Sequence, residues 1–286
     1  MLYLCAQTAC GADVQGAGYR SDSSGPIIQS VDAEQSVNPL HKGERVVYFK
    51  IGQGVSFGRL LDQRMSNLHY TGPGALLSFS RHLVSPDHVS TLTFARVGFQ
   101  YSQPAHEGTQ VYNPVFGFRY MQMRRLQTSW PVEVYLGGQA DVFANIRLIP
   151  ALSNSSLFSD VVAEMQPRGR IGLSPVLFQR EWLIDLELSV SLLAYGLQLP
   201  EYATIFQIGE DGRSRMNDTA PMLLHPGNYA RLGTGLFWHD SFGGADNPNR
   251  FRIGYAWEYY RIHGRHDLSV YNASHQLVLQ LFFRVN

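Results

Sequence analysis

The stretch VEVYLGGQADVFANIRL, residues 132–148, decides the fold. Every even position is apolar or glycine, whereas the odd positions include Glu133, Asp141 and Arg147. Strict alternation is the period of an extended strand whose two faces meet different surroundings. Strands in soluble proteins usually end after about 5–6 residues, and this one keeps its phase for roughly three times that length. Its apolar face therefore needs an apolar medium along the whole strand.

Amino-acid composition excludes two classes of protein. The chain has 286 residues with 23 basic and 23 acidic side chains, so it lacks the basic excess of a nucleic-acid-binding protein. No window approaches the roughly 20 apolar residues of a spanning helix, which excludes a helical membrane protein. Charged residues make up only 16%, against about 25% in an average soluble domain. This balance is typical of a protein whose outer surface is partly out of water.

The same alternation recurs from Val46 to the carboxyl terminus. In 46–58, for example, Phe49 and Ile51 share one face while Lys50 and Gly52 share the other. Such segments predict antiparallel strands with one apolar and one polar face. The strands expected from this pattern are 46–58, 74–83, 93–101, 114–122, 132–148, 169–179, 184–196, 229–239, 251–261 and 275–286.

The polar face distinguishes two all-β architectures. In a β-sandwich, lysine and glutamate would dominate the face in water, but lysine is nearly absent here. Arginines and carboxylates occur instead among glycine, serine and glutamine, and a guanidinium pairs with a carboxylate through a fixed fork. This favours a narrow, partly wet interior with a paired charge network. Its expected members are Arg96, Arg119, Glu133, Asp141, Arg147, Asp185, Glu187, Arg231, Arg252 and Glu258.

The apolar face is expected to contact lipid. Strands of about 9–11 residues or more with apolar-out, polar-in alternation are typical of transmembrane barrels, and lipid cannot satisfy a free sheet edge, so the sheet must close. We therefore predict an all-β, antiparallel, up-and-down transmembrane β-barrel in a bacterial outer membrane. The expected lipid-facing band includes Val134, Leu136, Val142, Leu186, Leu188, Val190, Ile253, Tyr255, Leu279 and Leu281.

The strand count is about ten, with twelve as the alternative. Segments 203–209 and 221–225 could add two strands. With both barrel ends periplasmic, the long connections at 149–160 and 197–228 would face outside, and the segment QREW at 179–182 would form a tight periplasmic turn. Short periplasmic turns and long external loops are the usual asymmetry.

The first 44 residues differ from the barrel, expected at 45–286. Residues 1–12 have a short apolar run followed by small residues, which indicates a signal-peptide remnant, with an ordinary flexible terminus as the alternative. Residues 13–44 are rich in Gly, Ser, Asp and Gln without a sustained period and are expected to be flexible, either plugging the lumen or extending into the periplasm. Cys5 and Cys10 are the only cysteines, so the barrel has no disulfide framework.

The carboxyl-terminal segment carries a family resemblance. Residues 249–286 contain "RIGY" at 252–255 and "SHQLVLQ" at 274–280 before a final alternating strand. This pattern resembles the carboxyl-terminal end of the PorP/SprF family of Bacteroidota outer-membrane proteins, with Gln276 where the family tends to have an acid. The resemblance implies an accessory barrel of the type IX secretion and gliding apparatus.

Candidate catalytic and metal-binding residues are few. The segment WHDSFGG contains His239 and Ser241 with the His-x-Ser spacing of outer-membrane lipid hydrolases, in which histidine activates serine for acyl transfer. The expected topology puts this pair at a periplasmic turn and on the lumen side, away from lipid. The segment HGRH at 263–266 lacks a nearby third ligand, so no metal site is expected. We predict a protein that is not an enzyme and binds no cofactor.

Three functions follow in order of preference. An interior near ten strands is only modestly wider than the eight-stranded kind that side chains fill, and open channels need about sixteen strands. We therefore expect an accessory or anchor subunit of an envelope protein complex for secretion or transport, with a small pore as the alternative and a lipid hydrolase using His239 and Ser241 as a further one. The expected partners are outer-membrane lipid, lipopolysaccharide and other envelope proteins, and not nucleic acid.

Overall fold

The barrel of the computed structural model lies within Asn38–Asn286. The described residues are 45–105, 109–130, 132–151, 157–177, 180–198, 206–208, 214–216, 221–242, 248–263 and 268–285. The expectations for 1–12 and 13–44, including Cys5 and Cys10, fall outside these residues.

All regular elements of the described residues are strands. No helix among them is long and apolar enough to cross a membrane. The strands of the main sheet are β1 (Val46–Asp62), β2 (His69–Val84), β3 (His88–Pro104), β4 (Val111–Leu126), β5 (Val132–Leu148), β6 (Leu157–Leu173), β9 (Leu183–Val190), β10 (Leu193–Gln198), β13 (Pro221–Leu224), β14 (Tyr229–Ser241), β15 (Arg250–His263) and β16 (Ser269–Val285).

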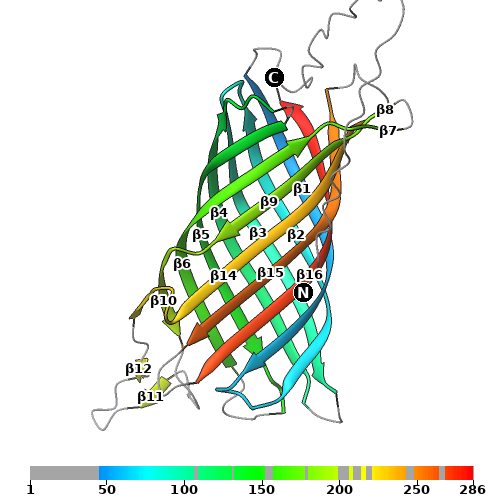
Figure 1. Ribbon diagram of the computed structural model, residues 1–286. Coiled ribbons are helices and arrows are strands. Elements are labelled where there is room, and N and C mark those ends of the chain that lie inside the picture. Colours follow the sequence, from blue (N-terminus) through cyan, green and yellow to red (C-terminus); the bar gives the residue numbers. More distant parts are fainter. Residues whose placement is uncertain are drawn as a thin grey trace, which may run out of the picture. The chain divides into compact units, whose positions relative to one another are not determined.

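The sheet closes into a barrel whose wall is ten strands around. β1 pairs with β2 on one side and with β16 on the other, from Val47↔Val285 to Asp62↔Val270. β9 and β10 both pair with β6, one after the other along its length, so together they count as one strand of the wall. β14 pairs with β9 and β13 pairs with β10, so β14 and β13 also count as one strand. Closure leaves no free edge along the wall from β1 to β6 and from β14 to β16, as lipid requires, and among the described strands the short β13 pairs only with β10. The prediction of a closed antiparallel barrel is confirmed, with ten strands rather than twelve (Figure 1).

Two short hairpins stand apart from this wall. β7 (Val176–Leu177) pairs with β8 (Arg180–Glu181), and β11 (Phe206–Ile208) pairs with β12 (Ser214–Met216). We call the end of the barrel where β16 finishes the upper end, and the opposite end the lower end. The β7–β8 hairpin lies at the upper end and the β11–β12 hairpin at the lower end (Figure 1).

The sixth strand of the barrel corrects the sequence prediction. It spans Leu157–Leu173, not 169–179, so the expected connection at 149–160 is shorter than predicted. The expected tight turn at 179–182 is part of a longer connection, 174–182, that includes β7 and β8. Pro167 lies inside β6, where β9 pairing ends at Arg168 and β10 pairing begins at Met165. Proline is tolerated there because no ladder hydrogen bond is needed from its nitrogen.

A bulge changes the phase of β3. Its register against β2 shifts at Phe79/Ser80, and its register against β4 shifts between Thr93 and Arg96. Thr93 is buried in the interior before the shift, whereas Arg96 faces inward after it and Phe94 is exposed outside. One extra residue in a strand exchanges which positions point inward. The bulge therefore lets β3 direct a threonine and then an arginine into the same lumen.

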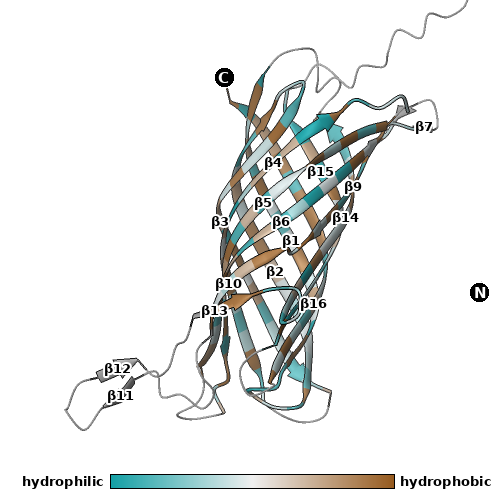
Figure 2. Ribbon diagram, turned by 60° about the vertical axis from the view of Figure 1, so that its left-hand side comes forward, coloured by the Kyte–Doolittle hydropathy of each residue, from teal (hydrophilic) through white to brown (hydrophobic). Residues whose placement is uncertain are grey.

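The two faces of the wall differ in polarity. Leu136, Val142, Leu186, Leu188, Val190, Ile253 and Tyr255 of the expected lipid-facing band are exposed on the outside, and Val134, Leu279 and Leu281 are half-buried on the same face. Hydrophobic and hydrophilic residues alternate along the strands (Figure 2). An apolar patch that encircles a molecule is far larger than monomeric proteins expose to water. The outer face is therefore suited to acyl chains.

Aromatic side chains gather near both ends of the wall. Near the upper end, the ring of Trp238 lies 5.3 Å from those of Trp182 and Phe251. Near the lower end, Tyr101 and Tyr112 lie 5.7 Å apart. Aromatic side chains at both ends of an apolar band are typical of the two interfaces of a transmembrane barrel.

Candidate functional site in the barrel lumen

Three groups of ion pairs cross the lumen at successive levels. All ten charged residues expected in the network lie at inward-facing positions of barrel strands, and each lies within ion-pair distance of an opposite charge. We name the groups the lower cluster, the middle network and the upper cluster. Glu133 is outside them, near the upper end, where it pairs with Arg125 at 3.1 Å.

The lower cluster consists of Asp62, Arg64, Arg147 and Asp160. Arg64 Nη2 lies 2.8 Å from Asp62 Oδ2 and 3.0 Å from Asp160 Oδ1. Arg147 also contacts both carboxylates, with Nε 3.0 Å from Asp62 Oδ2 and Nη2 bonded to Asp160. Each guanidinium thus bridges the same two carboxylates. Three of the four side chains are fully buried and Arg64 is nearly so, so the cluster excludes water from this level of the lumen.

The neighbouring carboxylates keep Arg64 of the lower cluster charged. Arg64 lies in the connection after β1. Burial alone would lower the pKa of Arg64, but the charges of Asp160 and Asp62 outweigh burial and raise this pKa above its ordinary value. A buried charge is tolerated when it is paired and hydrogen-bonded. Arg64 therefore stays cationic between the two carboxylates.

Apolar side chains pack around the lower cluster. They form one buried group that includes Leu60, Val111, Phe158, Ile262 and Val270, from strands on all sides of the barrel. Tightly packed apolar atoms leave few voids that could hold water. The lower end of the lumen is thus closed by a plug made of the wall's own side chains.

The middle network centres on Arg231 of β14. Its guanidinium contacts Asp141 at 3.1 Å, Glu258 at 2.7 Å, and Glu164. Arg119 pairs with Asp141 at 2.6 Å, and Arg96 pairs with Glu258 at 3.1 Å. These side chains come from six strands, so the network ties opposite walls together across the lumen.

The upper cluster gathers Arg168, Arg170, Asp185, Glu187, His239 and Arg252. Arg252 bonds to Glu187 and lies 3.5 Å from Asp185, while its guanidinium stacks 3.6 Å from the ring centre of Phe237. Arg168 also pairs with Glu187. A planar guanidinium suits both roles, pairing in its plane and stacking on an aromatic face.

Two cavities separate these levels. One of about 200 Å³ lies above the middle network and is lined by the upper cluster except Asp185, by Lys50 and His82, and by hydroxyl side chains of β2 and β3. A second of about 90 Å³ lies between the middle network and the lower plug and is lined by residues such as Asn145 and Tyr260. Arg96 and Glu258 line both cavities and pair at their boundary. The lumen is therefore divided into chambers.

His239 and Ser241 are not arranged as a catalytic pair. His239 Nε2 lies 2.6 Å from Asp185 Oδ2 and 3.1 Å from Arg252 Nε. This nitrogen therefore contacts two residues of the upper cluster. Among the hydrogen bonds of the described residues, none joins the Ser241 hydroxyl to His239. A nucleophilic serine needs a base within hydrogen-bond reach. Both residues also lie at inward-facing positions near the upper end, as the sequence predicted.

Metal ligands do not cluster in the part of the chain that the structure describes. No group of three or more His, Cys, Asp or Glu side chains there could hold a metal ion. Of the segment at 263–266, only His263 is described, and its Nδ1 lies 2.8 Å from Ser269 Oγ. The remaining three residues fall outside the described residues.

Several lumen residues escaped the sequence prediction. Asp62 continues the inward-facing even positions of 46–58 beyond the predicted strand end. Asp160, Glu164 and Arg168 occupy even positions of 157–173, a run with its own alternation. The alternation in 157–173 could therefore have identified Asp160, Glu164 and Arg168 as lumen residues. Arg64 lies in a connection, where strand periodicity gives no signal.

Comparisons with known proteins give structural similarities only. No protein-family model and no curated protein matches the chain. Similar solved structures include the translocator domain of the autotransporter NalP from Neisseria meningitidis, with 10% identity over 83% of this chain and 88% of that chain and a TM-score of 0.39. The outer membrane protease OmpT from Escherichia coli has 6% identity over 85% and 98%, with a TM-score of 0.41. The beta domain of the Bordetella autotransporter Brka has 10% identity over 84% and 100%, with a TM-score of 0.40.

These similarities assign no role to any residue of this chain, and they give no support to the PorP/SprF resemblance in particular. Location follows from three observations: the sheet closes through β1 and β16, its outer face is apolar, and aromatic side chains lie near both ends. The protein is an outer-membrane β-barrel.

Proposed function

We propose that this barrel is a non-enzymatic accessory or anchor subunit of an envelope protein complex and that it does not conduct solutes as a porin does. The observation that carries the proposal is the lower cluster. Arg147 reaches across the lumen to Asp62 and also pairs with Asp160 on the neighbouring strand, so fully buried ion pairs close the bore. A solute crossing this level would have to separate charges that have no water to replace their partners.

The middle network supports the same proposal. It lies above the plug, so a crossing solute would meet a second barrier of paired charges. A barrel of about eight strands is just wide enough for side chains to fill, and aqueous channels occur at about sixteen. A barrel of ten strands is closer in width to the kind that side chains fill than to an aqueous channel. The small-pore alternative is therefore disfavoured.

Contacts with other envelope proteins would use the barrel ends. Trp130, in the connection between β4 and β5, is 75% exposed, and Leu68, between β1 and β2, is 53% exposed. Exposed aromatic side chains are frequent anchors of protein interfaces. The resemblance of 249–286 to the PorP/SprF family would make the complex a secretion or gliding apparatus.

Two measurements test this proposal on the full chain. Native detergent extraction followed by identification of co-purifying proteins should recover a stable larger complex, and Trp130→Ala should weaken it while Phe116→Ala on the lipid-facing side should not. Planar-bilayer recording should show no steady large conductance. Recovery of a lone monomer would contradict the anchor role, and large stepwise conductance would contradict the closed lumen.

A further inference from the structure

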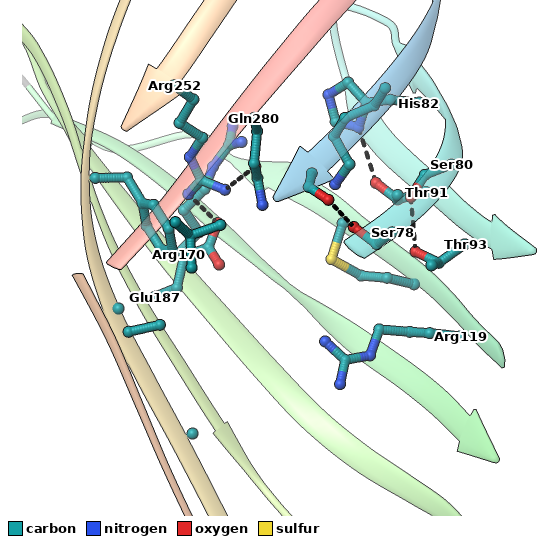
Figure 3. A pocket seen from close by; sticks show the side chains of 18 of the residues that line it. Ser78, Ser80, His82, Thr91, Thr93, Arg119, Arg170, Glu187, Arg252 and Gln280 are labelled. Carbon is teal, nitrogen blue, oxygen red and sulfur yellow. Dashed lines mark hydrogen bonds and ion pairs between the residues drawn. The ribbon is translucent and has the colours of Figure 1, made fainter. Parts of the chain in front are cut away.

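The 200 Å³ cavity has one wall rich in hydroxyl groups. Ser80 Oγ donates to Thr93 Oγ1 at 3.0 Å, and His82 Nδ1 lies 2.8 Å from Thr91 Oγ1. These side chains point from β2 and β3 toward the cavity, and Arg170, Glu187 and Arg252 of the upper cluster lie on its other side (Figure 3). A hydroxyl group can donate one hydrogen bond and accept two. This wall can therefore bond to a polar guest while keeping its internal contacts.

The charges around the cavity do not balance. Seven basic side chains line it, namely Lys50, Arg96, Arg119, Arg168, Arg170, Arg250 and Arg252, against two acidic ones, Glu187 and Glu258. Asp185 and Asp141, which pair with some of these arginines from just behind the lining, bring the acids to four. An excess of basic side chains therefore remains around a cavity inside the barrel. Low-dielectric walls concentrate such a field and attract anions.

Two of these basic side chains lack an acidic partner in the part of the chain that the structure describes. Among the described residues, Lys50 and Arg250 have no carboxylate within ion-pair distance, unlike the arginines of the upper cluster. They flank Phe282 on neighbouring strands, since Lys50 pairs in register with Phe282 and Phe282 with Arg250. Lys50 Nζ lies 5.9 Å from the ring centre of Phe282. Both side chains line the cavity.

Unsatisfied donors accompany them. The Nε atoms of Arg168, Arg170 and Arg250 are buried and have no hydrogen-bond partner in the structure. Buried polar groups are almost always hydrogen-bonded, so each exception requires an explanation. A guest with several acceptor oxygens would bring negative charge and hydrogen-bond acceptors close to these guanidinium groups.

We propose that this cavity is a binding site for a small solute that carries a carboxylate or phosphate group. The oxyanion lies between Lys50, Arg250 and the arginines of the upper cluster, and the remaining polar part of the solute bonds to the Ser80, Thr91 and Thr93 side of the cavity. Drug-sized ligands occupy pockets of about 300–1,000 Å³, so a cavity of about 200 Å³ selects smaller molecules. The middle network forms its floor, which makes it a blind chamber and not part of a transport path.

Calorimetric titration of the full chain tests the site. Protein refolded from inclusion bodies in non-ionic detergent contains no lipopolysaccharide phosphate, and the probes are inorganic phosphate and succinate at constant ionic strength, with tetramethylammonium chloride as the cationic control. We expect saturable binding of at least one of the two anions. Lys50→Gln and Arg250→Gln should each weaken it roughly tenfold or more, since each removes a charge-assisted hydrogen bond.

The matched control is Arg81→Gln, which removes the same charge from an exposed position on β2. It should leave binding unchanged, and Lys50→Arg should retain it. A heat-dependent shift in gel mobility establishes that each variant is folded, and Arg250→Gln decides the question if Lys50→Gln does not fold. The proposal is overturned if neither anion binds saturably to the wild type, or if Arg81→Gln weakens binding as much as the two cavity variants.

Discussion

Arg147 on β5 and Asp62 on β1 pair across the lumen, with 3.0 Å between Nε and Oδ2, although their strands are four places apart around the ring. Both side chains are fully buried. An ion pair of this kind stabilises less than its Coulomb energy suggests because both charges have lost their hydration. Its effect is strongest when one partner is removed, since the other is then left buried and uncompensated.

Arg147→Ala should destabilise the folded barrel by about 3–5 kcal/mol, because Asp62 and Asp160 would each lose a buried partner. Urea unfolding in detergent micelles, followed by heat-dependent gel mobility, measures this change. Arg59→Ala, which removes an exposed arginine from β1, should change stability by less than about 0.5 kcal/mol. Similar losses in the two variants would mean that the lower cluster is not buried in the membrane-inserted protein.

Val142→Arg should impair insertion of the barrel. Val142 is exposed on the outer face near the middle of β5, and an arginine facing lipid near the midplane costs about 2–4 kcal/mol. Val142→Leu keeps the site apolar and should insert normally. Yield of heat-modifiable protein in outer-membrane fractions compares the two variants. Equal yields would show that this face does not contact lipid.

Strand β4 reports the orientation of the barrel. Gln110 precedes this strand, Gln127 follows it, and both side chains are exposed at opposite ends of the wall. With Cys5 and Cys10 replaced by serine, Gln110→Cys should react with an impermeant thiol reagent on intact cells, because the connection between β3 and β4 is expected outside. Gln127→Cys should react only after lysis. The reverse pattern would invert the barrel and place His239 and Ser241 at the outer leaflet.

Ser241 should not react as a catalytic nucleophile. Its expected base, His239, is held by Asp185 and Arg252. A fluorophosphonate probe should therefore leave Ser241 unlabelled in the wild type and in His239→Ala alike. Labelling of the wild type that is lost in His239→Ala would establish a hydrolase and refute the non-enzymatic proposal.

The fold was predictable from sequence because alternation of polarity is a local property. The run at 132–148 matches β5 at both ends, since no proline or bulge interrupts it. The limits of β6 were harder to predict, because Pro167 lies inside this strand and proline is unusual in a central strand. The bulge near Phe94 likewise hid the first third of β3, because inward-facing positions are odd before it and even after it.

The pairing of lumen charges was less predictable. Sequence shows that Arg147 faces inward, but not that it meets Asp62, because such partners depend on the stagger of strands around the ring. Arg64 shows the limit most clearly. It lies in a connection, and only the folded barrel directs it back between Asp62 and Asp160.

The change from β9 to β10 beside Pro167 has a consequence for how the wall moves. Gln166 and Pro167 pair with neither strand, and Ser191 and Leu192 bond individually to Arg231 and Met165. Regions with irregular backbone bonding open at a smaller free-energy cost than continuous ladders. Deuterium should therefore replace amide hydrogens at Ser191 and Leu192 sooner than in the uninterrupted ladder between β1 and β16. Although the barrel is a closed ring, its wall is expected to open locally first where β9 gives way to β10.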